Sequence, residues 1–199
     1  MRYAISTLIF ATLLAGIGCG DAVEPPKPAA TTATRSPDVW QMLESRPLQL
    51  PALAPGEPCP TSTGKTVSPA YAPALGGGPV YPVGLGTDGV LRYSLGVGFA
   101  GSEWGGAKVL WISSPDYQGP ALIRGDQVDG TSEVRFENAL EAQRELRLTV
   151  EAWASSPDEE PGWRAWPSYT RLRAPGCYAY QVDGPGLSEV IVFRAIEVP

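Results

Sequence analysis

The chain has 199 residues, with 15 lysines and arginines against 21 aspartates and glutamates, a net charge of −6 and no histidine. Such an acidic chain, with lysine only at positions 27, 65 and 108, is a poor electrostatic match for nucleic acid, so we expect no nucleic-acid partner. The lack of histidine excludes Ser-His-Asp and Cys-His catalysis and all His-containing zinc sites. We therefore expect a protein that is not an enzyme and that holds no metal or cofactor.

Residues 1–18 have the layout of an export signal peptide. Arg2 supplies a positive start, and residues 4–17 form an uncharged apolar run that is too short to span a bilayer comfortably. Gly16 and Gly18 then provide small residues ahead of Cys19.

A cysteine directly after the cleavage site resembles the lipobox of bacterial lipoproteins, although Gly16 stands where that pattern prefers leucine. The resemblance implies that Cys19 is lipidated and becomes the mature N-terminus. The protein would then be anchored by lipid at the bacterial cell membrane or outer membrane, with its domain facing the periplasm or the exterior.

Residues 19–35 are rich in proline, alanine and threonine and have no apolar periodicity, so we expect a disordered tether. Residues 36–78 are expected to form a short helix and an extended segment packed on the domain. Ser36, Pro37 and Asp38 are typical of a helix start, and five prolines between residues 46 and 60 require irregular or extended backbone.

The chain has three cysteines, an odd number for an exported protein. If Cys19 carries the lipid, Cys59 and Cys177 are left to pair as a disulfide in an oxidising compartment. The bridge would pin the N-terminal segment onto the C-terminal part of the domain. Two unpaired buried thiols are the alternative.

Residues 79–199 show short apolar or alternating runs separated by glycine, proline and aspartate, the pattern of an all-β domain. Strands are expected near residues 80–84, 90–95, 108–113, 121–125, 132–137, 146–152, 168–173, 177–182 and 189–196. Alternation predicts that Leu148 and Val150 point inward, and the continuous apolar run in 108–113 predicts a central strand covered on both faces.

The C-terminal segment joins a Pro175-Gly176 corner, a tyrosine-bearing strand, a tight turn at 183–186 and a last apolar strand. It resembles the final hairpin of immunoglobulin-like domains and implies an antiparallel Ig-like β-sandwich of about 7–9 strands. A small β-barrel or jelly roll is the alternative. Segments 108–130 and 166–184 also resemble an uncharacterised family of exported bacterial proteins, which brings no known activity.

Four aromatic residues, Trp163, Trp166, Tyr169 and Trp104, form a possible binding surface. Aromatic rings in loops can stack on sugar rings or grip the side chains of a partner. Trp163 and Trp104 are the residues expected to be exposed. The alternative interpretation places Trp166 and Tyr169 in the core.

Two groups of carboxylates are candidates for reactive sites. Asp126 and Asp129 could face one Ca²⁺ ion, but turn formation explains them better. Asp158, Glu159 and Glu160 could support hydrolysis as paired acids, but adjacent acids in a proline-flanked loop are expected to be solvated.

The sequence favours an exported, lipid-anchored, non-catalytic envelope protein that acts as a binding or interaction module. Its expected partners are the membrane, through the lipid, and an envelope protein or polysaccharide. A structural envelope lipoprotein without a specific ligand is the first alternative, and a carboxylate-dependent hydrolase is the second.

Overall fold

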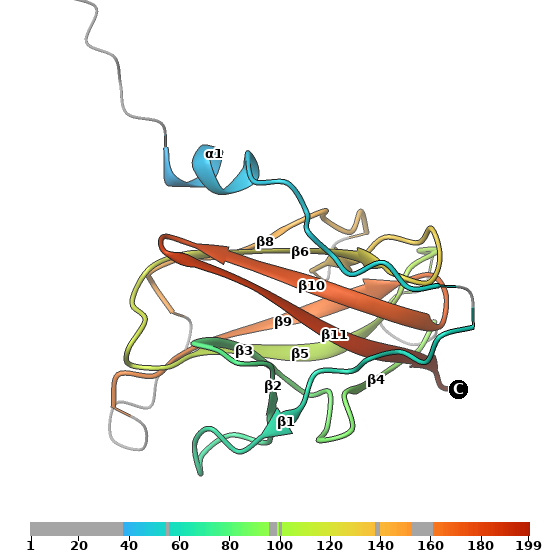
Figure 1. Ribbon diagram of the computed structural model, residues 1–199, viewed down its shortest axis with the longest axis horizontal. Helices are drawn as coiled ribbons and strands as arrows, with labels where there is room; N and C mark the ends of the chain where they lie inside the picture. The colour runs from blue at the N-terminus through green and yellow to red at the C-terminus, as the bar shows by residue number, and fades with distance from the viewer. Residues whose placement is uncertain (1–37, 55, 96–98, 100, 138–139, 153–160) are drawn as a thin grey trace, which may run out of the picture. The chain divides into compact units, whose positions relative to one another are not determined.

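The computed structural model describes residues 38–54, 56–95, 99, 101–137, 140–152 and 161–199 (Figure 1). Two packed sheets form a β-sandwich, which confirms the predicted fold class. Sheet A has the strand order β1-β2-β3-β5-β9-β7, and sheet B has the order β4-β11-β10-β6-β8. The strands are β1 (Gly64–Lys65), β2 (Ala74–Leu75), β3 (Val80–Val83), β4 (Val90–Tyr93), β5 (Gly105–Ser113), β6 (Ala121–Gln127), β7 (Arg135–Phe136), β8 (Leu146–Leu148), β9 (Arg164–Leu172), β10 (Gly176–Gly184) and β11 (Leu187–Glu197).

Each of the nine predicted strands corresponds to a strand of the structure, and two more, β1 and β2, extend sheet A before residue 79. Both additional strands have only two residues, too few for any alternating pattern to reveal them. The predicted antiparallel arrangement is wrong at one place, because β11 and β4 pair in parallel. After β4 the chain does not turn back in a hairpin but crosses to β5 in sheet A. The neighbour of β4 in sheet B is therefore the last strand, β11, and β4 and β11 run in the same direction.

The alternation predicted for residues 147–151 holds only within β8. Leu148 is buried, but Val150 is 57% exposed, so the prediction that Val150 points inward is wrong. The pairing of β8 with β6 ends at Leu148. Beyond it the chain is no longer a strand, so its side chains need not alternate between buried and exposed positions. The prediction for residues 108–113 is confirmed, since β5 lies between β3 and β9 and has buried residues on both faces.

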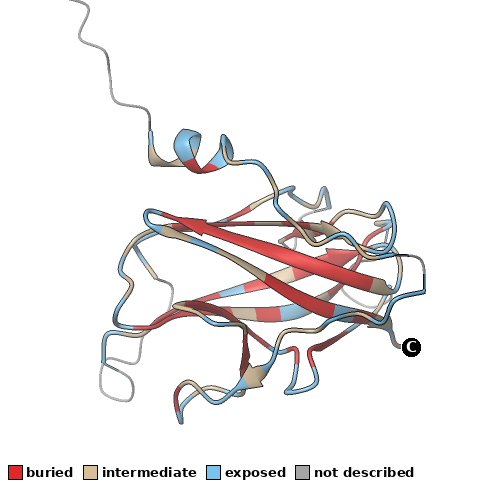
Figure 2. Ribbon diagram, viewed as in Figure 1, coloured by how far each residue is buried: buried red, intermediate tan, exposed pale blue. Residues whose placement is uncertain are grey.

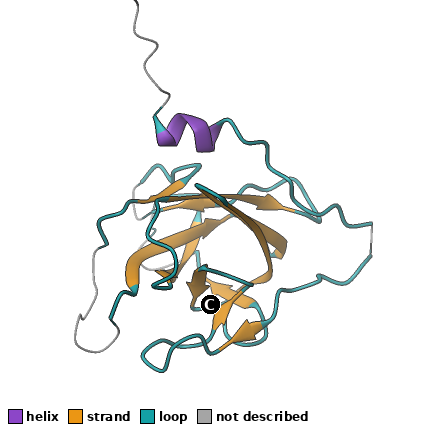
Figure 3. Cartoon of the chain, turned by 60° about the vertical axis from the view of Figure 1, so that its left-hand side comes forward, coloured by secondary structure: helices purple, strands orange, loops and turns teal. Residues whose placement is uncertain are grey.

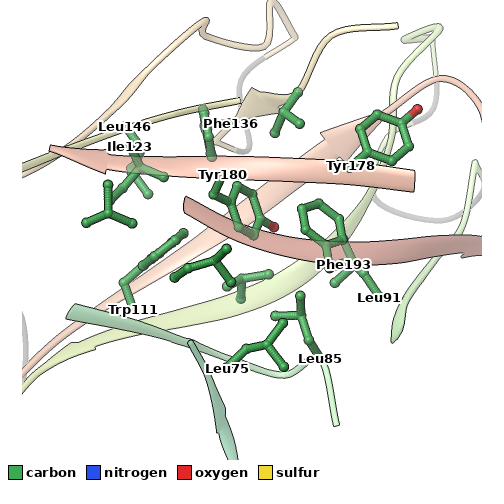
Figure 4. Packing of buried hydrophobic residues seen from close by; sticks show 14 of the residues in the cluster. Leu75, Leu85, Leu91, Trp111, Ile123, Phe136, Leu146, Tyr178, Tyr180 and Phe193 are labelled. Carbon is green, nitrogen blue, oxygen red and sulfur yellow. The ribbon is translucent and has the colours of Figure 1, made fainter. Parts of the chain in front are cut away.

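The core between the sheets is built around Tyr180 of β10 (Figure 4). Its ring stacks on Phe193 at a centroid distance of 4.4 Å and meets the edge of Trp111 at 5.2 Å. The buried phenol oxygen lies 2.7 Å from the Thr170 hydroxyl. The centre of β10 is therefore packed and hydrogen-bonded on its inner side, and the strand is buried along most of its length (Figure 2).

The N-terminal helix is present as α1 (Val39–Glu44), which lies outside the sandwich (Figure 3). The structure places the N-cap at Asp38, which makes no side-chain capping bond, whereas the predicted capping residue Ser36 is outside the described residues. Leu43 is the helical residue that is fully buried. At the other end of the helix, the Arg124 guanidinium donates to the carbonyls of Leu43 and Glu44.

Residues 46–54 and 56–62, which we call the strap, run extended over the outer face of sheet B, as their prolines predict. The Gln49 backbone N–H donates to the Gln181 side chain at 2.6 Å, and the Ser62 N–H donates to the Val192 carbonyl at 2.8 Å. The predicted disulfide between Cys59 and Cys177 is present and ties the strap to β10. Among the described residues, no helix is long and apolar enough to cross a membrane.

Candidate functional site

Two of the four predicted surface aromatic residues are buried. Trp166 faces the core from β9 and is 7% exposed, as the alternative interpretation expected. Trp104 is also 7% exposed, so its predicted exposure is wrong. The guanidinium groups of Arg135 and Arg173 lie over its ring at 5.5 and 4.0 Å, and these long side chains cover the indole from solvent.

The other two, Tyr169 and Trp163, are half-buried on the outer side of sheet A. Tyr169 meets the ring of Phe99 edge-on at 5.5 Å and lies opposite Lys108 in the β5–β9 ladder. Trp163 directly precedes β9, at the other end of the same strand. The four predicted residues therefore do not form one surface, and each of them lines a different hollow.

The Trp163 groove is an open hollow of about 380 Å³ at one end of the sandwich. This volume lies within the ordinary range for ligand sites. Its lining residues are Lys65, Thr66, Val67, Tyr81, Ser114, Pro115, Asp116 and Trp163.

The position of Trp163 is set by the two loops that meet beside it. Gly162 adopts a φ of +81°, and a Cβ atom at this residue would come within 3.0 Å of the Pro115 side chain. A glycine is therefore needed for the close approach of the two loops. The Gln118 side-chain amide donates to the Pro115 carbonyl at 3.0 Å and to the Gly162 carbonyl at 3.2 Å, which ties the loops together.

Arg164 also holds the loop that follows β5, through hydrogen bonds to its carbonyls. It is buried, and one guanidinium nitrogen donates to the carbonyls of Tyr117 and Gly119, each at 2.9 Å. Burial lowers the pKa of the Arg164 guanidinium. A buried charge that satisfies loop carbonyls holds those carbonyls in place, so the groove is formed before any ligand binds.

Two aromatic side chains, Trp163 and Tyr81, form the part of the groove lining that we call the aromatic floor. The rings of Trp163 and Tyr71 lie 5.8 Å apart in a tilted arrangement, and both pack on a cluster of buried residues on the outer face of sheet A. That cluster includes Tyr81 of β3 and Ile112 of β5. This packing leaves Trp163 half-buried, and Trp163 also lines the groove.

Charged groups surround this aromatic floor. The Lys65 ammonium lies 5.4 Å from the centre of the Tyr81 ring and donates to the Gly77 carbonyl at 3.1 Å. Burial raises the pKa of the Tyr81 phenol, and the negative charges of Glu189 and Asp116 raise it further. Asp116 itself is exposed at the rim. The groove thus combines an aromatic face with a carboxylate, an ammonium group and a phenol.

A second hollow, of about 480 Å³, lies beside β9 and β8. Leu146, Leu148 and Trp166 form its apolar wall, and Glu137 is the carboxylate that lines it. Glu137 has a φ of +71°, which is uncommon for a residue other than glycine, and burial raises its pKa. A single acid with no second carboxylate in the wall does not match the paired acids of glycoside hydrolysis.

The remaining predicted carboxylates are not assembled into a metal or catalytic site. Asp129 accepts from the Cys177 backbone N–H at 2.9 Å and from the Gln127 side chain, which is the expected turn-stabilising role. The described part of the chain contains no group of three or more metal-ligating side chains. Asp158, Glu159 and Glu160 lie outside the described residues.

Sequence reasoning missed Arg164, Gln118 and Gly162, the residues that hold the groove. Each carries out its role through contacts between loops that are far apart in the sequence, and no local pattern marks such contacts. The glycine immediately before an aromatic residue at 162–163 was the one available signal of a strained turn.

No protein family model matches this sequence, and no curated protein matches it. Among solved structures, the CooA pilin subunit from enterotoxigenic Escherichia coli is similar, with a TM-score of 0.32 and 8% sequence identity over 61% of this chain and 100% of that chain. A similarity this distant says nothing about function.

Proposed function

We propose that this protein is an exported, lipid-anchored and non-catalytic envelope protein whose β-sandwich acts as a binding module through the Trp163 groove. The observation that carries the proposal is a partly exposed tryptophan that lines an open groove with charged groups around it. Export is supported by the signal-like residues 1–18, and the Cys59–Cys177 disulfide suits an oxidising compartment.

The way the groove is held favours binding over a purely structural role. The ties made by Gln118 and Arg164 fix the loops, while Thr66 and Asp116 at the rim stay exposed. A preformed aromatic site loses little conformational entropy when it takes a ligand.

Photocrosslinking in intact cells tests this function. A photoreactive amino acid is placed at Thr66, on the rim of the groove, or at Glu57, an exposed residue of the strap over the other sheet. We expect Thr66 to capture one dominant envelope component, identified by mass spectrometry, and Glu57 to capture only abundant neighbours.

The capture from Thr66 should fall sharply when Trp163 is replaced by alanine. Equal captures from Thr66 and Glu57, unchanged by Trp163→Ala, would contradict the proposed function and favour the structural alternative.

A further inference from the structure

We propose that the ligand of the Trp163 groove is an uncharged saccharide chain. This inference rests on the proposed function and adds the chemical class of the ligand. It is drawn from three features of the groove, namely its aromatic floor, the charges at its rim and its construction from loops.

The aromatic floor suits a pyranose ring. The C–H groups on one face of a sugar ring carry a slight positive charge, and they are attracted to the negative face of an aromatic ring. Trp163 is a half-buried residue that lines the groove, and its contact with Tyr71 at 5.8 Å limits the rotation of the indole. A sugar ring can therefore stack there without ordering a mobile side chain.

The rim provides partners for hydroxyl groups. Asp116 is an exposed carboxylate beside the aromatic floor, and a carboxylate accepts strong, charge-assisted hydrogen bonds from sugar hydroxyls. Thr66 places its hydroxyl, which can donate or accept, on the same rim. Stacking combined with several hydroxyl partners distinguishes a saccharide from a purely apolar ligand.

The charge balance favours an uncharged saccharide. The Lys65 ammonium donates to the Gly77 carbonyl and lies over the Tyr81 ring. Asp116 in the same lining balances its charge, so the groove has no net positive charge to attract an anionic sugar. Asp116 and the net charge of the chain, −6, would repel such a sugar.

The construction of the groove argues against an extended peptide as the ligand. A peptide that adds to a sheet needs a run of free backbone groups along a strand edge. Of the two strands that contribute to the lining, β1 has only two residues, and β3, which carries Tyr81, lies between β2 and β5 and is not an edge strand. The rest of the lining consists of loop side chains. The groove is also open, so a chain of sugar units can pass through it.

The test measures binding of the purified full-length protein to soluble chito-, cello- and malto-oligosaccharides and to delipidated wall polysaccharide from the source cells. We expect at least one of these saccharides to bind saturably. Trp163→Ala should weaken that binding at least about 10-fold, and Trp163→Phe, which keeps an aromatic face, should weaken it less. Asp116→Asn should also reduce the affinity.

Trp40→Ala is the matched control, since Trp40 is a half-buried tryptophan on α1 that is covered by Arg147. Its affinity should equal that of the wild-type protein. Absence of binding to every saccharide, or equal binding by Trp163→Ala, would overturn the inference. If Thr66 still captured a protein partner in cells, the proposed function would stand without its saccharide ligand.

Discussion

Two buried arginines of β9 hold loops at opposite ends of the molecule. Arg164 donates to carbonyls of the loop that follows β5, and Arg171 donates to the carbonyls of Gly105 and Trp104 at 3.1 and 2.8 Å. Arg164 makes no ion pair with a carboxylate among the described residues. The main partners of both arginines are backbone carbonyls, which would be costly to bury without a donor.

Arg164→Ala should lower the free energy of unfolding by about 3 kcal/mol, because it leaves several loop carbonyls without their donor. Urea denaturation measures this loss. Arg92→Ala is the control, since Arg92 makes an exposed ion pair with Asp88 that contributes at most about 0.5 kcal/mol. Equal losses for the two variants would show that Arg164 does not organise the groove.

Tyrosine ionisation should set the alkaline limit of stability. Burial is the main cause that raises the pKa values of Tyr93 and Tyr178, each to about 12. In the unfolded chain these phenols ionise near pH 10, while the folded protein keeps them protonated. The free energy of unfolding should therefore be insensitive to these tyrosines below pH 10 and should fall between about pH 10 and pH 12.

Denaturation at a series of alkaline pH values tests this expectation. Tyr178→Phe removes one of the two phenols and keeps the ring, so its loss of stability between pH 10 and pH 12 should be smaller than that of the wild-type protein. An identical pH dependence in the two proteins would contradict the assigned role of Tyr178.

At the scale of elements, the Cys59–Cys177 disulfide is the covalent bond that holds the strap on sheet B. The backbone bonds of the strap to sheet B are few, and the disulfide joins positions separated by 118 residues. Closing so long a loop lowers the conformational entropy of the unfolded chain, which stabilises the folded protein by at most about 5 kcal/mol.

The double variant Cys59→Ser/Cys177→Ser should lose about 2–4 kcal/mol of stability and melt at a lower temperature than the wild-type protein. Hydrogen exchange should increase most in the strap near Cys59, because the other ties of the strap to sheet B are at its two ends, at residues 46–49 and at Ser62. An unchanged melting temperature would mean that the strap is held without the bridge.

The elements that sequence reasoning located best are those whose own residues carry the signal. The last hairpin and the central strand β5 follow from continuous apolar runs and a Pro-Gly corner, and the disulfide follows from the cysteine count. The parallel pairing of β4 with β11 was missed because it depends on which sheet the chain enters next. The burial of Trp104 was missed because the covering arginines lie far along the chain.

At the scale of the whole molecule, the two outer faces of the sandwich are occupied differently. The strap covers sheet B, whereas the outer face of sheet A carries a small cluster around Tyr81 and ends at the Trp163 groove. The strap therefore leaves the outer face of sheet A, with the groove, uncovered by residues 46–54 and 56–62.

The anchor is tested separately from the groove. Cys19→Ser removes the cysteine that the lipobox-like pattern marks, so the variant should leave the membrane fraction and become soluble. Cell fractionation measures the change, and Trp163→Ala, which keeps Cys19, should stay with the membrane. Persistent membrane association of Cys19→Ser would show that the anchor lies elsewhere.

The most direct test of the central claim is carboxyl-group footprinting of the protein in intact cells, compared with the purified protein. Asp116 lies on the rim of the Trp163 groove, and Glu57 is an exposed carboxylate on the strap. If the groove binds an envelope component, Asp116 should be labelled several-fold less in cells, Glu57 should be labelled equally, and Trp163→Ala should restore the labelling of Asp116. Equal labelling of Asp116 in cells and in solution would contradict the claim that this groove is the binding site.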